Sequence, residues 1–352
     1  ENKMKIEYGA TNDIEEECAN FAEAYAAYDS YGIGNGIAIE EEWAHISVEV
    51  VLWNLRDILF PSVTWSVEEK IDGANYSFLV DCDTLEVRPA KRSSITSEDF
   101  FDGQAVFNKY KDAANVLAAI IKLEYPSVEV VQIYGELFGM GIQNRVFYGE
   151  KDFKAFDIRI TLADYSKYLN PVEVAELCEL AKMPTAPVLA TGLTFSEAMA
   201  YSPVFNSVIT PREGDNFVEG VVLKPSSVLI LGTGARVVIK NKSDKYKEKS
   251  SKKKTRKTQA WSADMNDVYA TLSQYNNENR IRSAISKLGK LTNKDFGLLL
   301  KTVSVDILED WGKEHEFFPL TKKDQKSLTS QLNKDVANLI RANFLNIIDG
   351  VF

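Results

Sequence analysis

Histidine and cysteine are the rarest reactive residues in this chain. His45 and His315 are the only histidines, and Cys18, Cys82 and Cys178 are far apart and odd in number. Zinc sites of the Cys/His type and nucleophilic triads built on histidine are therefore poorly supported. The cysteine pattern argues against a disulfide framework and indicates a reducing compartment, so a cytoplasmic protein is expected. Any catalysis by this chain would therefore depend on lysine, arginine and carboxylate side chains.

Long uncharged apolar runs are also missing. A membrane-spanning helix needs about 20 consecutive apolar residues, so we expect neither a signal peptide nor a membrane span. Apolar residues make up 45% of the chain and charged residues 26%, which is ordinary for a globular protein. Because 352 residues are many for one compact domain, we expect a larger catalytic domain and a smaller appended one.

The net charge of -10 hides an uneven distribution. Residues 1–70 carry 15 Asp/Glu against 4 Lys/Arg, whereas residues 236–257 carry 11 Lys/Arg against two acids. A polyanion such as a nucleic acid would meet the second region and not the first.

The distribution of residue types along the sequence predicts an α+β domain followed by helices. Short runs rich in Val, Ile, Tyr and Phe, mixed with helical stretches in no regular alternation, favour antiparallel sheets over a doubly wound fold. The expected strands are 64–69, 76–81, 86–89, 128–134, 153–160, 220–224 and 235–240, and the expected helices between them are 105–122 and 171–182.

Four segments are expected along the chain. They are an acidic N-terminal extension (1–60), which includes a short helix at 48–60, a catalytic domain (61–243), a basic linker (244–260) and a helical C-terminal domain (261–352). The linker is too polar to bury a core. In the C-terminal domain, apolar residues at three- and four-residue spacing predict helices at 276–288, 293–302, 305–312 and 321–348.

The string Glu69-Lys70-Ile-Asp-Gly-Ala-Asn75 directly follows a predicted strand. A Lys-x-Asp-Gly string is expected by chance in about one chain in ten of this size. Taken alone, it is better explained as a surface turn in which Asp-Gly supplies the bend. The residues that follow it along the chain change that balance.

These companions are charged or aromatic residues in short motifs near strand ends. In chain order they are Arg92 in Ala-Lys-Arg-Ser, Glu136 in Tyr-Gly-Glu-Leu-Phe-Gly, Phe156 in Phe-Lys-Ala-Phe-Asp, Glu219 in Val-Glu-Gly-Val-Val-Leu-Lys, and Lys240 with Lys242 in Val-Val-Ile-Lys-Asn-Lys. With these motifs in this order, the sequence resembles the covalent nucleotidyltransferase superfamily of ligases and capping enzymes. Within it, the chain is most similar to the phage RNA ligase 2 family. The resemblance extends over roughly residues 64–350.

The resemblance implies a role for each motif residue. Lys70 would be the catalytic lysine that carries AMP, Lys240 and Lys242 would hold the triphosphate, and Arg92 and Asn75 would contact the ribose or the 5′-phosphate. Glu136 would accept the ribose hydroxyl and, with Glu219, help to bind Mg²⁺ or Mn²⁺. Phe156 would stack on adenine, while Phe153 is expected in the core. Glu69 would approach the adenine edge, and Lys224 and Gln143 also match family positions.

Elementary chemistry agrees with these roles. An amine attacks the α-phosphorus of ATP only when it is neutral, and neighbouring cations together with a divalent metal favour the neutral amine. Lys240, Lys242 and Arg92 are the candidate neighbours, and such fixed cations are the main catalytic resource in phosphoryl transfer.

Two departures from the family pattern stand out. Asp72 occupies a position where the RNA ligase 2 family often has histidine, and aspartate there is the usage of DNA ligases and capping enzymes. The acidic N-terminal extension is longer than the family normally carries.

We therefore expect an ATP-dependent RNA ligase that seals 3′-hydroxyl/5′-phosphate nicks in double-stranded RNA or an RNA–DNA hybrid as a monomer. The nearest alternatives are a DNA ligase and a GTP-dependent capping enzyme of the same superfamily, which usually append an OB-fold barrel where this chain is expected to be helical. A catalytically inactive nucleic-acid-binding relative is a further alternative, although binding alone would not require Lys70.

Overall fold

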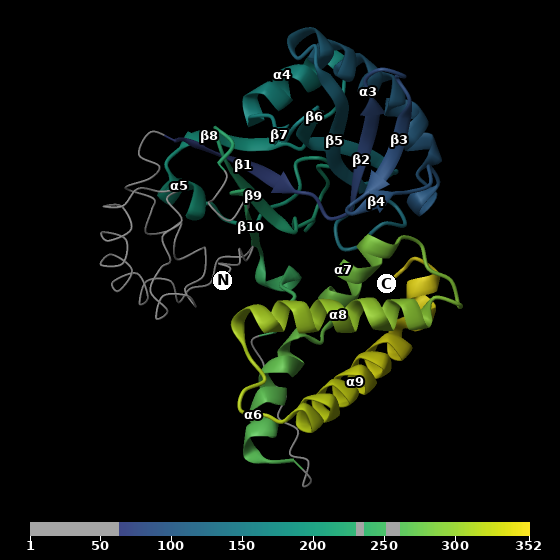
Figure 1. Cartoon of the computed structure of the whole chain (residues 1–352), viewed down its shortest axis with the longest axis vertical. Helices are drawn as coiled ribbons and strands as arrows, with labels where there is room; N and C mark the ends of the chain where they lie inside the picture. Colours follow the sequence, from purple (N-terminus) through teal and green to yellow (C-terminus); the bar gives the residue numbers. More distant parts are fainter. Residues whose placement is uncertain (1–62, 230–235, 251–260) are drawn as a thin grey trace.

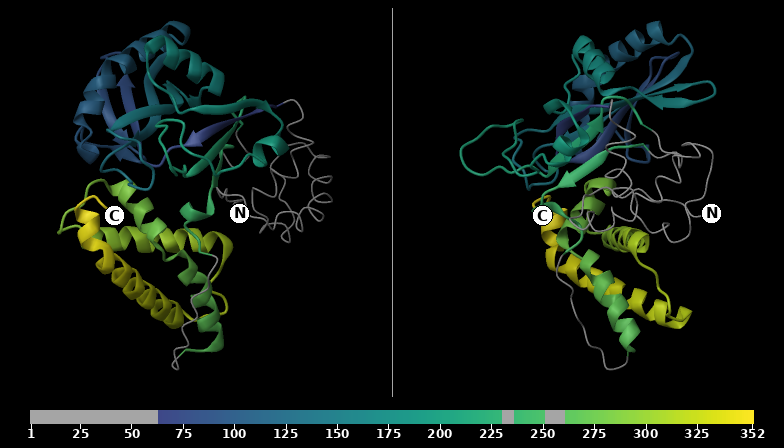
Figure 2. Two further views of the ribbon diagram at one scale, coloured as in Figure 1. Left: turned by 180° about the vertical axis from the view of Figure 1, so that it is seen from behind. Right: turned by 90° about the vertical axis from the view of Figure 1, so that its left-hand side faces the viewer.

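The computed structural model describes residues 63–229, 236–250 and 261–352 (Figure 1). The predicted acidic extension with its helix at 48–60, and residues 251–260 of the predicted basic linker, lie outside the described residues. The described part consists of two antiparallel sheets with helices, followed by a group of helices (Figures 1 and 2). The predicted fold class, an α+β domain on antiparallel sheets with a helical C-terminal part, is confirmed.

The larger sheet has six strands, and each pairs with its neighbours in antiparallel fashion. Two helices cover one face of it and pack on its buried side chains. In spatial order the strands are β4 (Ser94–Ile95), β3 (Val87–Lys91), β2 (Ala74–Asp81), β5 (Val128–Phe138), β6 (Asp152–Leu162) and β7 (Ser166–Tyr168), and the helices are α3 (Gln104–Glu124) and α4 (Pro171–Ala181).

Successive side chains of strand β2 point alternately to the two faces of this sheet, one of which is apolar and the other polar. Tyr76 and Phe78 are fully buried in the core beneath α3 and α4, as is Phe153 of β6, which confirms the prediction for Phe153. Asn75 lies one residue out of step with Tyr76 and therefore points to the opposite face. That second face meets the smaller sheet, so polar residues can gather between the two sheets.

The smaller sheet has four strands, also antiparallel. A short helix, α5 (Phe195–Met199), packs against it through the ring of Phe195, whose centroid lies 5.0 Å from that of Trp65. In spatial order the strands are β10 (Ile239–Lys242), β9 (Gly220–Pro225), β1 (Trp65–Lys70) and β8 (Val188–Leu193).

The C-terminal helices build a core of their own around buried leucine, isoleucine and valine side chains and the indole of Trp311. They lie below the sheets in Figure 1, and α7 is the helix that approaches the sheets most directly. The helices are α6 (Ala263–Leu272), α7 (Glu278–Leu288), α8 (Phe296–Glu314) and α9 (Lys322–Ile348).

Several details differ from the sequence predictions, which did not include the short elements β4, β7 and α5. The helices predicted at 293–302 and 305–312 are one helix, α8, because Val303 and Ile307 continue the buried stripe across the expected break. Strand β10 begins at Ile239 and not at residue 235. Strand β8 was not predicted because its side chains are exposed or half-buried without the alternation that marks a strand.

Direct hydrogen bonds join the helical part to the sheets. The side chain of Gln143 donates to the carbonyl of Arg282 in α7 at 2.8 Å, and that of Asn144 donates to the carbonyl of Gly350, just after α9, at 2.6 Å. Within the described residues, none of the helices combines the length and the apolar character needed to cross a bilayer.

Candidate active site

The predicted site residues gather in two adjoining cavities. One, with a volume of about 440 Å³, lies between the two sheets, and the other, of about 260 Å³, lies between the sheets and helices α7 and α8. Five of the predicted residues line both cavities, so they stand at the junction. These five are Lys70, Asn75, Arg92, Glu136 and Lys240. Glu69 and Phe156 line the first cavity alone, and Glu219 and Lys242 line the second.

Lys70 is the last residue of β1, and its amine lies 2.5 Å from Oε2 of Glu219. The turn after it depends on glycine, because a Cβ atom at Gly73 would lie 2.3 Å from the carbonyl oxygen of Leu137. Glu219 directly precedes β9, where Gly220 pairs with Lys70 across the sheet. The local fold therefore brings the amine and this carboxylate together at one sheet end.

Glu219 binds two lysines at once. Its second oxygen, Oε1, lies 3.1 Å from Nζ of Lys242 in β10. Burial alone would raise the pKa of the Glu219 carboxyl, but the charges of Lys70, Lys242 and Arg145 outweigh it and lower that pKa to about 2. This carboxylate is therefore ionised at any pH at which the protein works.

Two further groups at the junction have strongly shifted pKa values. Burial, together with the charge of Glu219, raises the pKa of Glu136 to about 7, against the pull of nearby cations. Burial and the positive charges of Lys70 and Arg92 lower the pKa of Lys240 to about 8. Both groups therefore titrate near neutral pH, which is the usual condition of groups at functional sites.

The first cavity combines an aromatic ring with a buried charge network, of which the sequence analysis named Lys224 but missed Glu68. Phe156 lines the cavity, and Nζ of Lys224 lies 5.5 Å from its ring centroid and donates to its carbonyl oxygen at 2.6 Å. Lys224 also pairs with Glu68 at 2.8 Å. Glu68 stands two residues before Lys70 on β1, so strand periodicity places both on the cavity face. That spacing was the available signal.

Asn75 and Arg92 line both cavities. The Oδ1 atom of Asn75 is buried and has no hydrogen-bond partner among the described residues. A buried acceptor without a donor is costly, so a ligand hydroxyl or a water would be held there. Arg92 is exposed and can reach an incoming phosphate.

The side chain of Glu69 is engaged away from the other residues predicted to bind ATP. Its carboxylate accepts hydrogen bonds from the hydroxyl of Ser207 at 2.7 Å and from the amide of Val208 at 2.9 Å. Because it alternates with Glu68 and Lys70 on β1, this carboxylate belongs to the other face of the strand. Any contact that Glu69 makes in the cavity would come from its backbone.

Asp72, the residue that departs from the family pattern, has a dedicated partner. Arg145 binds both of its carboxylate oxygens, at 2.5 and 3.1 Å, and its guanidinium lies 4.5 Å from the ring centroid of Tyr246. Burial raises the pKa of the Asp72 carboxyl although Arg145 opposes the shift. Arg145 also donates to Asn279 of α7 at 3.0 Å. The turn that follows Lys70 is therefore tied to the helical part.

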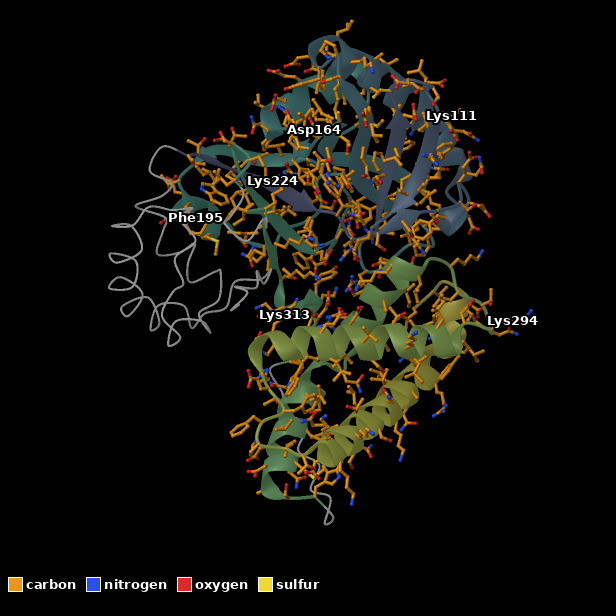
Figure 3. All side chains as sticks on the ribbon, viewed as in Figure 1. Lys111, Asp164, Phe195, Lys224, Lys294 and Lys313 are labelled. Carbon is orange, nitrogen blue, oxygen red and sulfur yellow. The ribbon has the colours of Figure 1, made fainter. Side chains whose placement is uncertain are left out.

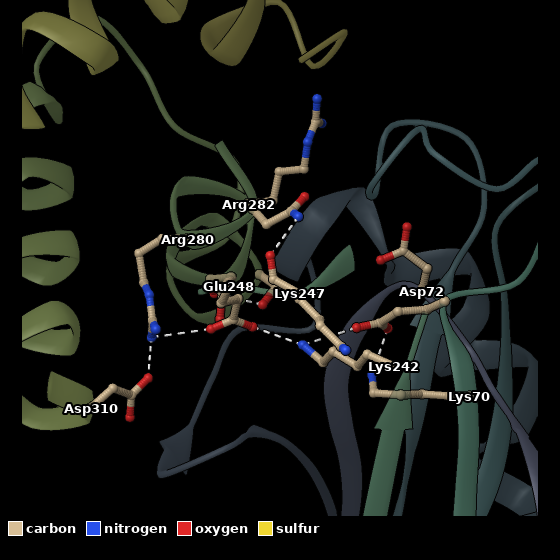
Figure 4. Close-up of polar contacts among 12 residues, drawn as sticks. Lys70, Asp72, Lys242, Lys247, Glu248, Arg280, Arg282 and Asp310 are labelled. Atoms are coloured by element: carbon tan, nitrogen blue, oxygen red, sulfur yellow. Dashed lines mark hydrogen bonds and ion pairs between the residues drawn. The ribbon is translucent and has the colours of Figure 1, made fainter. Parts of the chain in front are cut away.

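A second chain of charges leaves the site through Glu248 (Figure 4). Lys242 lies 2.8 Å from Glu248, Glu248 lies 3.1 Å from Arg280 of α7, and Arg280 pairs with Asp310 of α8. Burial would lower the pKa of Lys242, but Glu219 and Glu248 raise it. Lys242 therefore stays charged at pH values at which Lys240 begins to lose its proton.

The donor set at the junction fits Mg²⁺ or Mn²⁺ bound together with phosphate. No cluster of three or more His, Cys, Asp or Glu side chains suited to a metal occurs in the described part of the chain. Magnesium usually takes one or two carboxylates and completes its shell with phosphate oxygens and water. Glu219, ionised, and Glu136, close enough for their charges to interact, meet that requirement.

Family models match both parts of the chain. The model described as RNA ligase matches residues 63–242, just over half of the chain, and the one described as T4 RNA ligase 2 C-terminal matches residues 258–338. The chain belongs to the RNA ligase family. Its helical part is of the RNA ligase 2 type, and the resemblance to the phage RNA ligase 2 family is confirmed.

Solved RNA ligases from Naegleria gruberi are similar to part of this chain. An apo mutant matches at 20% identity and a TM-score of 0.38 over 52% of this chain and 50% of its own. A mutant with ATP and Mn matches at 21% identity and a TM-score of 0.37 over 52% and 51%. The ligase with PPi matches at 20% identity and 0.38 over 52% and 50%. The chain spans about half the length of these structures.

Proposed function

We propose that this RNA ligase uses ATP to seal 3′-hydroxyl/5′-phosphate nicks in double-stranded RNA or an RNA–DNA hybrid, as a monomer, through an AMP group on Lys70. The observation that carries the proposal is the position of the Lys70 amine at the junction of the two cavities. One cavity has the aromatic ring and the orphaned acceptor that suit a nucleoside, and the other has the lysines that suit phosphates.

The first step joins Lys70 to AMP. Phe156 would stack on adenine, and Asn75 and Glu136 would accept ribose hydroxyls. With these groups in place, Nζ of Lys70, having given its proton to solvent, attacks the α-phosphorus. The bond from that phosphorus to the bridging oxygen breaks, and pyrophosphate leaves. Lys240 and Lys242 stabilise the charge that develops on the phosphoryl oxygens.

Glu219 and Glu136 would hold Mg²⁺ or Mn²⁺ in this step, and the metal's charge would offset that of the phosphates. Lys242 stays protonated because Glu219 and Glu248 both face it, so it remains a fixed cation throughout. Apart from the proton that Lys70 loses, the charged residues of the site can thus bind and orient the triphosphate with their charges unchanged.

The second and third steps act on the nicked strand. An oxygen of the 5′-phosphate attacks the AMP phosphorus and releases Lys70, and the 3′-hydroxyl then attacks the 5′-phosphorus and releases AMP. Arg92 is exposed at the junction and would bind the 5′-phosphate. Arg280 and Lys287 of α7 line the same cavity, so the helical part would meet the nucleic acid beside the nick.

The test compares nicked duplexes that differ only in the sugar of one strand. We expect sealing when the strand with the 3′-hydroxyl is RNA, and much slower sealing when it is DNA, with ATP as the required nucleotide. The matched control is Lys70→Arg, which keeps the charge and should seal none of them. Sealing with GTP and not with ATP would contradict the proposal and favour a capping-type enzyme. Equal sealing of all-DNA nicks would favour a DNA ligase.

A further inference from the structure

Helix α9 presents a row of cations on its exposed side. Lys322, Lys326, Lys334 and Arg341 are all exposed. At about 100° per residue, their spacing places them within about 120° of one another around the helix. The remaining face of α9 carries Leu328, Leu332, Val336 and Ile340, which are fully buried in the helical core. The helix is therefore amphipathic, and its outer face is positively charged.

These cations line a groove of about 940 Å³ that runs along α9 and is bounded on the other side by α8. Leu300 of α8 and Phe317, which follows α8 in the chain, line that other side. No carboxylate lines the groove among the described residues, although the whole chain has a net charge of -10. The other lining side chains are mainly hydroxyls and amides, which include Thr329, Ser330, Asn333 and Asn338.

The cations of the groove differ from those of the active site in their partners. Lys70, Lys242 and Arg280 each bind a carboxylate. Within the described ranges, none of the four groove cations forms an ion pair. The nearest acids on α9 are engaged elsewhere: the carboxylate of Asp324 accepts from the amide and hydroxyl of the N-cap Thr321, and that of Asp335 accepts from Tyr269 and Gln331. The positive charge of the groove is therefore left for an external anion.

We propose that the α8–α9 groove is a second nucleic-acid contact that binds the phosphate backbone of the duplex away from the nick. This proposal rests on the proposed function, which makes a duplex the substrate. At 1.5 Å per residue, Lys322 and Arg341 are about 28 Å apart, which matches about eight base pairs at the rise of about 3.4 Å of B-form DNA and somewhat more in the shorter A-form duplex of RNA. Lysines, hydroxyls and amides contact phosphates and 2′-hydroxyls without reading bases, as a ligase that acts at any sequence requires.

The groove also lies where a duplex leaving the active site can reach it. The end of α9 next to Arg341 approaches the sheets, where Gly350 accepts the hydrogen bond from Asn144. From there α9 runs away from the sheets toward its first residue (Figures 1 and 2). A duplex that contacted both regions would therefore run from the sheets outward along α9.

The experiment measures binding of a fluorescent nicked RNA duplex by the full-length protein at several salt concentrations. The test variant is K326Q/K334Q, which removes two charges from exposed helix positions. The matched control is K111Q/K182Q, which removes two exposed charges from the sheet domain, where Lys111 of α3 lies far from the C-terminal helices α6 to α9 (Figure 3). A second control, K326R/K334R, keeps the charge. Self-adenylylation with ATP is measured on the same samples.

For K326Q/K334Q we expect about a 3- to 10-fold weaker Kd near 0.1 M salt and a salt slope smaller by about 1.5 to 2, because each phosphate contact releases counterions. Both control variants should bind like the unmodified protein, and all should adenylylate at the same rate. Unchanged duplex binding by K326Q/K334Q, or an equal loss in K111Q/K182Q, would overturn the groove assignment. If the unmodified protein did not adenylylate, the proposed function would fail, and the binding comparison would still decide on the groove.

Discussion

The active site and the α8–α9 groove are both rich in cations, but they hold them in opposite ways. In the active site, Lys70 and Lys242 are largely buried and bind the same carboxylate, Glu219. In the groove, Lys326 and Lys334 are exposed, and no carboxylate lines the groove with them in the described structure. Buried, fixed charges suit chemistry on one phosphorus, whereas exposed charges suit salt-dependent binding of many phosphates. The same residue type therefore serves two purposes, and burial separates them.

The largest expected effect comes from removing a buried cation. Lys242→Ala leaves the phosphates without a fixed positive partner, so we expect the rate of self-adenylylation to fall about 10²- to 10³-fold. Lys326→Ala, the matched change in the groove, should leave that rate unchanged. Single-turnover labelling with ATP measures both. Equal effects of the two substitutions would remove the distinction between the two regions.

The next effect concerns the buried pair of Asp72 and Arg145. Asp72→Asn leaves the Arg145 guanidinium buried without its anion, so the free energy of unfolding should fall by about 3–5 kcal/mol. The exposed pair of Asp102 and Lys290 is the control, and Asp102→Asn should cost less than about 1 kcal/mol. Urea unfolding measures both. In the double variant Asp72→Asn/Arg145→Gln, part of the loss should be recovered, and full additivity would contradict a direct pair.

Loss of the Lys240 proton should weaken the use of ATP at alkaline pH, whereas an exposed lysine would keep its charge there. Its pKa of about 8 lies far below that of an ordinary lysine, so its charge is lost as the pH rises through 8. Between pH 7 and pH 9 the charged fraction falls by about tenfold, and the KM for ATP in self-adenylylation should rise by up to that factor. Lys240→Arg keeps its charge and should flatten this limb. If the KM for ATP still rises with pH in Lys240→Arg, a group other than Lys240 must cause the rise.

Protonation of Glu136 should slow self-adenylylation at acid pH, and this effect should be smaller than that of Lys240 at alkaline pH. Burial raises its pKa to about 7, so its carboxylate form, which accepts a ribose hydroxyl, becomes populated only as the pH rises through 7. Adenylylation should therefore increase between about pH 6 and pH 8, and Glu136→Gln should be slower but independent of pH in this range. The same shift makes Glu136 destabilising above its unfolded pKa of 4.5, with the full cost reached above pH 7. Thermal unfolding of the two proteins at pH 5 and pH 8 measures that cost.

The sequence predicted the parts of this site that local patterns encode. Strand periodicity and motif order placed Lys70, Glu136 and Lys240 near strand ends, and the structure brings these residues together. Glu68 could have been added, because it stands two residues before Lys70 on the same strand. The helical character of the C-terminal part followed from apolar spacing, although its α8 helix was divided in two.

The features that could not be predicted join residues far apart in the chain. Nothing near Asp72 indicates that Arg145 binds it, and nothing near Glu248 indicates that Arg280 does. These pairs depend on how the helical part docks on the sheets, which is a tertiary property. The groove was missed for a related reason: the charges of α9 are spread over five turns and are visible as one surface only once the helix is packed.

The most direct test of the central claim is to locate a covalent adenylate. The protein is incubated with Mg²⁺ and ATP labelled at the α-phosphate, digested with protease, and its peptides are sequenced by mass spectrometry. We predict one AMP group on Lys70, stable to alkali and released by acid as a phosphorus–nitrogen bond requires, and no label in Lys70→Arg. An adenylate on a different residue, or label that persists in Lys70→Arg, would contradict the account.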